Sequence, residues 1–249
     1  MSVQVKKTSL LVLRLATAAL SLGILAQGCS ETVEERPALV NQMESGKAPA
    51  SLTGFFGADY SKLRPGGEGK AALVYINPNA NWGQYNKILL EPVEFWDSAH
   101  STIPPSDQQA LTTYGYNQLK QDLQQHFTMV DRRGPGVMVL RVALIDATAA
   151  TPGLRSVSVV IPQVQLLNRL QSLGTGSYAF AGSAEGEMKL TDATTGELLA
   201  AAVDKRAGGV ALSTAAQWKW GDAQNAMNYW ARRITDRLLE LQGRSTARE

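Results

Sequence analysis

Two glutamates separated by a single residue, Glu185 and Glu187, are the first side chains in this sequence that could act together in chemistry. Residues two apart on a β-strand point to the same face, so the two groups could flank a sugar as paired carboxylates. Ser183 and Lys189 continue the same alternation. A row of Ser, Glu, Glu and Lys is typical of a solvent-exposed sheet face, and we favour that interpretation.

The two histidines, His100 and His126, do not form a recognisable metal site. They are far apart in the sequence, and neither belongs to a pattern such as HExxH. His126 is expected at the end of a helix, where a positive charge interacts favourably with the helix dipole. The sequence contains no calcium-binding loop of the EF-hand type. We therefore predict no metal site and structural or solvent-exposed positions for both histidines.

Two further segments fall short of known catalytic motifs. Around Ser183, the neighbouring glycines stand at the wrong offsets for a nucleophile elbow. The glycine-rich segment 66–70 is only superficially similar to a phosphate-binding loop, because Arg64 stands where the motif requires glycine and Ala71 where it requires Ser or Thr. The sequence thus predicts no catalytic residue, no nucleotide and no other cofactor, and we expect a non-enzymatic protein.

Four aromatic residues gather near the end of the chain, although aromatic residues make up only 7% of it. They are Trp218, Trp220, Tyr229 and Trp230. Packing of the last expected helix explains Trp230. Trp218 and Trp220 are therefore the candidate surface for a partner or a ligand, since tryptophan is enriched among residues that anchor contacts. The charged run 204–206 could recognise an acidic group, although a charged strand end explains it as well.

The elements expected to position these residues begin with three extended segments. Residues 71–76 form a short apolar run, and residues 87–95 are mostly apolar. Pro92 lacks a backbone donor, which predicts a sheet edge or an irregularity at that point. Residues 137–145 are almost continuously apolar, a pattern typical of a strand covered on both faces.

A β-hairpin is predicted in the second half of the chain. Residues 178–190 alternate clearly, with small and apolar residues such as Ala184 and Met188 on one face and polar residues on the other. Residues 191–196 are rich in turn formers, and residues 197–205 return as the second strand.

Two amphipathic helices are expected to cover the sheet. The first begins near Ser106, which we predict as the N-cap with Gln109 as its capping-box partner, and it ends near residue 126. The second covers residues 222–241 and ends before Gly243. Strands between two such helices indicate an α+β fold, with the helices packed on a mainly antiparallel or mixed β-sheet.

Residues 157–173 are the most ambiguous part of the sequence. They begin like a strand, are interrupted by Pro162, and continue with apolar residues at helical offsets. Such a segment could lie on a membrane, form an interface with a partner or cross the core, and we favour the core.

The first 28 residues have the pattern of an export signal. Lys6, Lys7 and Arg14 precede an uncharged apolar run over residues 15–26. A membrane-spanning helix needs roughly 20 apolar residues, so this run is too short to cross a bilayer. We predict that residues 1–28 are removed as a signal peptide.

Residues 25–29, Leu-Ala-Gln-Gly-Cys, resemble the lipobox of bacterial lipoproteins. The resemblance implies cleavage before Cys29, the only cysteine, which then carries a diacylglycerol thioether and a further acyl chain such as palmitate. Several acyl chains together hold a protein firmly to a membrane. Ser30, rather than Asp, follows the cysteine. In lipoproteins of Gram-negative bacteria this implies the outer membrane, with the protein facing the periplasm.

Processing before Cys29 changes the charge of the chain. Residues 1–28 contain three positive and no negative side chains, so the formal net charge of +2 becomes −1 for residues 29–249. The basic character belongs to the leader, and we predict no nucleic-acid partner. Residues 29–51 lack a sustained hydrophobic period and are expected to form a lipidated flexible tether. Residues 52–249 should form a single domain that relies on its core rather than on disulfides.

Several longer blocks of the sequence are specific enough to compare with known families. They are residues 54–56, 59–66, 192–196, 199–209, 220–222 and 229–231. These blocks resemble a bacterial family of lipoproteins called domain of unknown function 3313. The resemblance covers nearly all of the predicted domain, and it implies no activity, ligand or site residue.

Our leading hypothesis from the sequence is a non-enzymatic outer-membrane lipoprotein whose periplasmic domain binds a protein partner in envelope structure or assembly. The alternative is a domain that binds or hydrolyses a small molecule or glycan through the region of Trp218 and Trp220. The sequence does not decide the oligomeric state.

Overall fold

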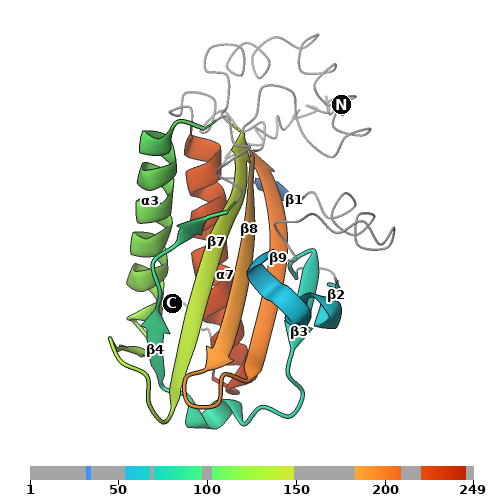
Figure 1. Ribbon diagram of the computed structural model, residues 1–249, viewed down its shortest axis with the longest axis vertical. Helices are drawn as coiled ribbons and strands as arrows, with labels where there is room; N and C mark the ends of the chain where they lie inside the picture. Colours follow the sequence, from blue (N-terminus) through green and yellow to red (C-terminus); the bar gives the residue numbers. More distant parts are fainter. Residues whose placement is uncertain are drawn as a thin grey trace, which may run out of the picture.

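A single open β-sheet organises the fold in the computed structural model, which describes residues 32–34, 54–67, 70–96, 103–148, 183–208 and 220–244. The described residues form nine strands in the hydrogen-bonded order β2-β3-β9-β8-β7-β4-β6, with β1 paired to β9 and β5 paired to β7. The three longest strands lie side by side at its centre (Figure 1). They cover Val137–Thr148 (β7), Ser183–Asp192 (β8) and Leu198–Gly208 (β9).

The strands β8 and β9 form the predicted hairpin and pair antiparallel along most of their length. Asp192 closes the turn between them, because its carboxylate accepts hydrogen bonds from the backbone amides of Thr194 and Thr195, at 2.8 and 2.7 Å. Gly196 follows with a φ of +73°, a conformation that favours glycine. Residues 178–182, predicted as the start of the hairpin, lie outside the described residues.

Shorter strands extend the sheet on both sides of this centre. β3 pairs antiparallel with β9, and β4 pairs parallel with β7. The extended region predicted over residues 87–95 divides around Pro92 into β4 and β5, which both pair with β7, so the predicted irregularity is confirmed. The short strands cover Thr32–Glu34 (β1), Arg64–Pro65 (β2), Leu73–Ile76 (β3), Lys87–Leu90 (β4), Glu94–Phe95 (β5) and Thr128–Met129 (β6).

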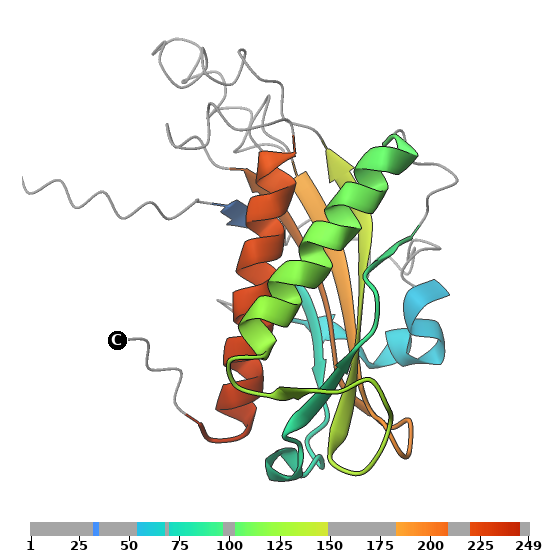
Figure 2. The ribbon, with the colours of Figure 1, turned by 90° about the vertical axis from the view of Figure 1, so that its left-hand side faces the viewer.

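Two long helices, α3 over Pro105–Leu123 and α7 over Gly221–Leu241, pack together on one face of the sheet (Figure 2). They approach closely at Gly115, where an added Cβ would lie 3.5 Å from the sulfur of Met227. Gly243 takes a φ of +67° just after α7, as expected of a helix stop. The predicted α+β class, with two helices on a mixed sheet, is therefore confirmed.

The start of α3 differs from the prediction. The helix begins at Pro105, with Pro104 as its N-cap and no capping side chain, so Ser106 lies within the first turn. Proline suits the first helical position, because the N–H that it lacks would have no partner in the helix. Gln109 donates to the hydroxyl of Thr113 at 3.0 Å instead of reaching back to the cap.

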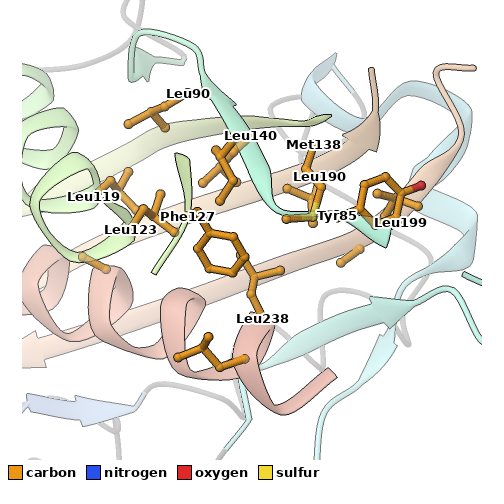
Figure 3. Packing of buried hydrophobic residues seen from close by; sticks show 14 residues of the cluster. Tyr85, Leu90, Leu119, Leu123, Phe127, Met138, Leu140, Leu190, Leu199 and Leu238 are labelled. Atoms are coloured by element: carbon orange, nitrogen blue, oxygen red, sulfur yellow. The ribbon is translucent and has the colours of Figure 1, made fainter. Parts of the chain in front are cut away.

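The largest hydrophobic cluster lies between the two helices and the sheet (Figure 3). Leu140 of β7, Leu190 of β8 and Leu199 of β9 are fully buried there. Leu123 of α3 and Leu238 of α7 complete the cluster from the helix side. Full burial of one such side chain contributes about 1.5–3 kcal/mol, so this helix–sheet contact is a main source of stability.

The opposite face of the sheet is also covered. The segment that begins at Phe55 and continues into the short helix η1, Gly57–Lys62, lies there, in front of the strands in Figure 1. Phe55 and Phe56 pack against Ala143 of β7 and Val203 of β9. The strand predicted over residues 137–145 is therefore covered on both faces, as its continuous apolar pattern indicated.

Two sequence predictions concern segments mostly outside the described residues. Of the tether predicted over residues 29–51, the structure describes Thr32–Glu34, which pair with β9 as β1. These three residues join the sheet because β9 extends beyond its pairing with β3 and leaves its edge open to another strand. Residues 157–173 lie outside the described residues, so their place in the core stays a prediction.

Candidate functional site

A groove of about 130 Å³ runs between α7 and the strands β3 and β9. It forms where the helix layer ends, because α7 packs mainly on β8 and β9 while β3 extends the sheet beyond them. The floor is apolar and comes from four elements. Val74 and Ile76 belong to β3, Met188 to β8, Ala202 to β9 and Ile234 to α7. The methyl group of Ala202 leaves the floor open between the larger side chains.

Positively charged side chains surround the groove. Arg233 and Arg237 lie one turn apart on α7, Tyr229 lies one turn earlier, and Lys70 approaches from the segment before β3. Residues four apart share one face of a helix, which explains why the three α7 residues line the same groove. Among the described residues that line it, none is acidic. The groove can therefore attract an anionic group next to an apolar one.

An ion-pair network fixes α7 against the strands that form the groove. Oδ2 of Asp204 accepts hydrogen bonds from Nε of Arg206 and from the indole N–H of Trp230, both at 2.9 Å. Its Oδ1 accepts one from the backbone amide of Ala72 at 3.3 Å. The guanidinium of Arg206 also donates to the hydroxyl of Tyr229 at 2.9 Å and lies 3.8 Å from its ring centroid. The network thus ties β9 both to α7 and to the segment leading into β3.

Trp230 can reach this network because Gly186 on β8 has no side chain. Gly186 lies opposite Asp204 in the β8–β9 pair. A Cβ at Gly186 would lie 2.9 Å from Cζ3 of Trp230, which is closer than real Cβ contacts allow. This glycine within the alternating strand therefore makes room for the indole ring.

Glu187 lies on the opposite face of the sheet and is buried, with 1% of its surface exposed. Neither oxygen of its carboxyl group has a hydrogen-bond partner among the described residues. Its neighbours across the sheet are Ala143 and Val203, which belong to the cluster around Phe55. Burial raises the pKa of Glu187 to about 8, and the negative charge of Glu185 adds to the effect. The carboxyl group is therefore protonated at neutral pH.

This arrangement corrects the interpretation of residues 183–189 as a solvated sheet face. Glu187 is buried, and the ammonium group of Lys189 pairs with Asp59 of η1 at 2.7 Å. The alternation separates the two faces correctly, but it contains no information about a second layer that covers the polar one. The side chain of Glu185 is 12% exposed and its carboxylate lies 3.9 Å from the ammonium group of Lys205, so the two glutamates do not share an open site.

Trp220 lies in the core rather than on an open surface. Its side chain is 3% exposed, and its indole N–H donates to Asp107 in the first turn of α3 at 3.0 Å. The residue therefore joins the starts of the two helices. Trp218, the other candidate for a ligand or partner surface, lies outside the described residues, as does Cys29.

The other predicted features can be placed only in part. His126 is exposed in the turn after α3, whereas His100 lies outside the described residues. In the part of the chain that the structure describes, no group of three or more His, Cys, Asp or Glu side chains could hold a metal ion. No helix among the same residues is long and apolar enough to cross a membrane.

The groove itself was not among the sequence predictions. One signal was present, because Tyr229, Arg233 and Arg237 recur every four residues beside the apolar Ile234. The contribution of Lys70 could not be found in this way. It depends on the pairing of β3 with β9, two strands far apart in the chain.

The fold and the groove define an α+β domain with two helices on one face of a mixed sheet and a cationic, apolar-floored cleft beside the second helix. Residues 53–234 match the family described as Protein of unknown function (DUF3313), and the chain belongs to this family. The family resemblance found in the sequence is thereby confirmed. Comparison with curated proteins gave no match.

Several solved structures are similar to this chain at low sequence identity. A PelC dodecamer from Paraburkholderia phytofirmans is 11% identical, with a TM-score of 0.37 over 66% of this chain and 94% of that chain. Protein XCC0632 from Xanthomonas campestris, of family DUF330, is 12% identical, with a TM-score of 0.38 over 68% and 93%. A neuraminyllactose-binding hemagglutinin homolog from Helicobacter pylori is 12% identical, with a TM-score of 0.33 over 73% and 94%. At these TM-scores the likenesses carry no argument about function.

Proposed function

We propose that this chain is a lipid-anchored envelope protein that acts by binding rather than by catalysis, and that the groove along α7 is its binding site. The observation that carries the proposal is an apolar floor combined with the cationic side chains of Lys70, Arg233 and Arg237. Ligand sites are usually apolar clefts with a few convergent polar groups. The partner would therefore present an apolar portion beside an acidic one.

The proposed location depends on Cys29. The lipobox-like residues 25–29 support lipidation there, and Ser30 supports the outer membrane, with the domain in the periplasm. We expect Cys29→Ser to abolish labelling of the chain by a palmitate analogue and to remove the chain from the outer-membrane fraction. Unchanged outer-membrane fractionation of this variant would contradict the proposed anchor.

Two kinds of partner fit an apolar groove that cationic side chains surround. One is an envelope protein that presents aliphatic and acidic side chains, with a role in envelope structure or assembly. The other is a small molecule. Hydrolysis of a glycan gains no support from the predicted carboxylates, because Glu187 is buried against the cluster around Phe55.

The experiment that tests the site is photo-crosslinking of the full chain in intact cells. A photoreactive amino acid is placed at Val74 in the groove, and the matched control position is Gln109, which is exposed on α3. We expect an adduct at Val74 and none at Gln109. A protein partner would give a large shift on a gel, whereas a small molecule would add a small mass to the intact chain. No adduct at Val74, or equal adducts at both positions, would contradict the groove as the binding site.

A further inference from the structure

The groove does not end at the side of α7, because smaller cavities adjoin it beneath the helix. One of about 60 Å³ shares Met188, Ala202 and Ile234 with the groove. Another of about 30 Å³ shares Ile76, Met188 and Ile234. These adjoining cavities lie between α7 and the sheet, and together they are called the seam.

The seam is almost entirely apolar among the described residues. Leu140, Leu190 and Leu238 line its 30 Å³ cavity, and Figure 3 shows these side chains converging between α7 and the strands. Three ionisable residues, Glu187, Asp204 and Arg233, also line the 60 Å³ cavity. The carboxylate of Asp204 already accepts hydrogen bonds from Arg206 and Trp230, and Arg233 lies where this cavity meets the groove. The seam therefore offers dispersion contacts and little hydrogen bonding.

This shape distinguishes between the two kinds of partner. A peptide carries an N–H and a C=O group at nearly every residue, and burying them in the seam without partners would be unfavourable. An unbranched alkyl chain carries no polar group, and each methylene that it buries contributes about 0.8 kcal/mol. The seam therefore fits an alkyl chain better than a polypeptide.

The cations determine the other end of the ligand. Arg233, Arg237 and Lys70 surround the groove where the seam begins. Arginine binds carboxylates and phosphates through paired hydrogen bonds, and a lysine adds a point charge. Arg237 also contacts Glu240 at 2.8 Å, but both side chains of this pair are about two-fifths exposed, so the contact is weak. The head group should therefore be anionic.

We infer that the groove binds a linear amphiphile, with its alkyl chain in the seam beneath α7 and a carboxylate or phosphate head between Lys70, Arg233 and Arg237. This inference rests on the proposed function, since it takes the groove as the binding site. It narrows the partner from any acidic and apolar group to a single-chain anionic lipid or fatty acid.

The test is isothermal titration calorimetry on the full chain carrying Cys29→Ser, which removes the acylation site and avoids detergent. Four probes with the same twelve-carbon chain are used: dodecanoate, dodecyl phosphate and dodecyltrimethylammonium below their micelle concentrations, and dodecanol below its solubility limit. We expect the two anions to bind, dodecanol to bind about 10-fold more weakly, and the cation to bind more weakly still. A preference between the two anions would identify the head group.

Three variants separate the head group from the chain. Arg233→Gln should weaken dodecanoate about 10-fold and leave dodecanol unchanged, a difference that a general loss of structure would not produce. Ala202→Leu narrows the floor of the groove and should weaken every probe. Arg232→Gln is the matched control, because Arg232 is on the same helix but does not line the groove, and it should leave all affinities unchanged. If Arg233→Gln lowers the thermal midpoint, Lys70→Gln in the exposed segment before β3 replaces it.

Equal affinity for dodecanoate, dodecanol and the cation would overturn the anionic head group. Dodecanoate binding that survives both Arg233→Gln and Ala202→Leu would overturn the site. Absence of binding by every probe to the folded chain would overturn the inference as a whole. The proposed function fails separately, through the Val74 crosslinking. A protein adduct there would retain the groove as a binding site but replace the amphiphile with a protein partner.

Discussion

The two faces of the sheet each bury ionisable side chains, but they treat them in opposite ways. On the helix face, Asp204 and Arg206 are 5% and 7% exposed and form an ion pair with further hydrogen bonds. On the face beneath η1, Glu187 is 1% exposed and has no hydrogen-bond partner among the described residues. A buried charge is tolerated when partners replace its water, and without partners a carboxyl group takes up a proton instead.

The ion pair on the helix face connects several elements of the fold. Asp204 can serve α7, β9 and the segment leading into β3 at once, because its two oxygens accept hydrogen bonds from Arg206, Trp230 and the amide of Ala72. The neutral Glu187 connects nothing in this way. The two residues are therefore expected to respond differently to substitution and to pH.

The largest effect on stability is expected from removing one partner of the buried ion pair. Asp204→Ala leaves the guanidinium of Arg206 buried without its carboxylate, and we expect the free energy of unfolding to fall by about 3–5 kcal/mol. Urea denaturation followed by circular dichroism measures this. Glu240→Ala is the matched control, since it removes an exposed ion pair with Arg237 that is worth about 0–1 kcal/mol. Similar losses in both variants would refute the special role of Asp204.

The second prediction concerns the pH dependence that Glu187 imposes. Its pKa rises from 4.5 to about 8 in the folded chain, so the stabilisation from its neutral form is complete below pH 4.5 and is lost as the pH rises to about 8. The loss should amount to roughly 1.4 kcal/mol per pH unit in this window. Glu187→Gln removes the titrating group, and it should be more stable than the parent by about 4 kcal/mol near pH 7.5.

Urea titrations of both chains at several pH values from 4 to 9 provide the measurement. The two curves of unfolding free energy against pH should diverge above pH 4.5 and become parallel above pH 8. Parallel curves over the whole range would show that folding does not change the pKa of Glu187, and they would contradict the prediction. Glu240→Gln serves as the control, because its side chain is about two-fifths exposed near the end of α7 and is not among the groups that shift the pKa of Glu187.

A smaller effect is expected where the indole ring meets the sheet. Gly186→Ala places a methyl group 2.9 Å from Cζ3 of Trp230, which is too close for a van der Waals contact, and displacement of the ring should cost about 1–3 kcal/mol of unfolding free energy. The tryptophan emission should shift as well. Gly67→Ala is the matched control, because an added Cβ there meets no atom within 4 Å. An unchanged stability of Gly186→Ala would mean that Trp230 can move without loss.

The smallest effect separates the ring of Tyr229 from its hydroxyl. Tyr229→Phe removes the hydrogen bond to Arg206 but keeps the aromatic face 3.8 Å from the guanidinium. We expect a loss of about 1 kcal/mol in the free energy of unfolding, measured by urea denaturation. Tyr229→Ala should lose more, because it also removes the cation–π contact. Equal losses would assign the whole contribution to the hydroxyl.

The comparison also explains how far the sequence could predict the fold. Alternation at period two and recurrence at helical spacing identified the hairpin, the two helices and the buried strand over residues 137–145, because those patterns depend on local geometry. The same rules could not place Glu187. Its burial depends on Phe55 and η1, which are more than a hundred residues earlier in the chain.

The candidate site, like the burial of Glu187, could not be predicted from local sequence patterns. The sequence drew attention to Trp218 and Trp220 because tryptophan is rare, yet Trp220 is used to join two helices. The sequence does not identify any single arginine of the groove as a binding residue, because cationic side chains on a helix are usually solvated. Their role as lining residues of a groove is visible only in the fold, where β3 places Lys70 and an apolar floor beside them.

With the lipid proposed on Cys29, the pairing of β1 with β9 would hold the domain close to its membrane. Thr32 is already in the sheet, opposite Gly208. Only two residues separate Thr32 from Cys29, the proposed lipid-bearing residue. The fully extended chain from Cys29 to Thr32 spans roughly 10 Å. A linker this short would prevent the domain from crossing the periplasm to a distant partner. It would instead sample ligands at the surface of its own membrane, where amphiphiles are most concentrated.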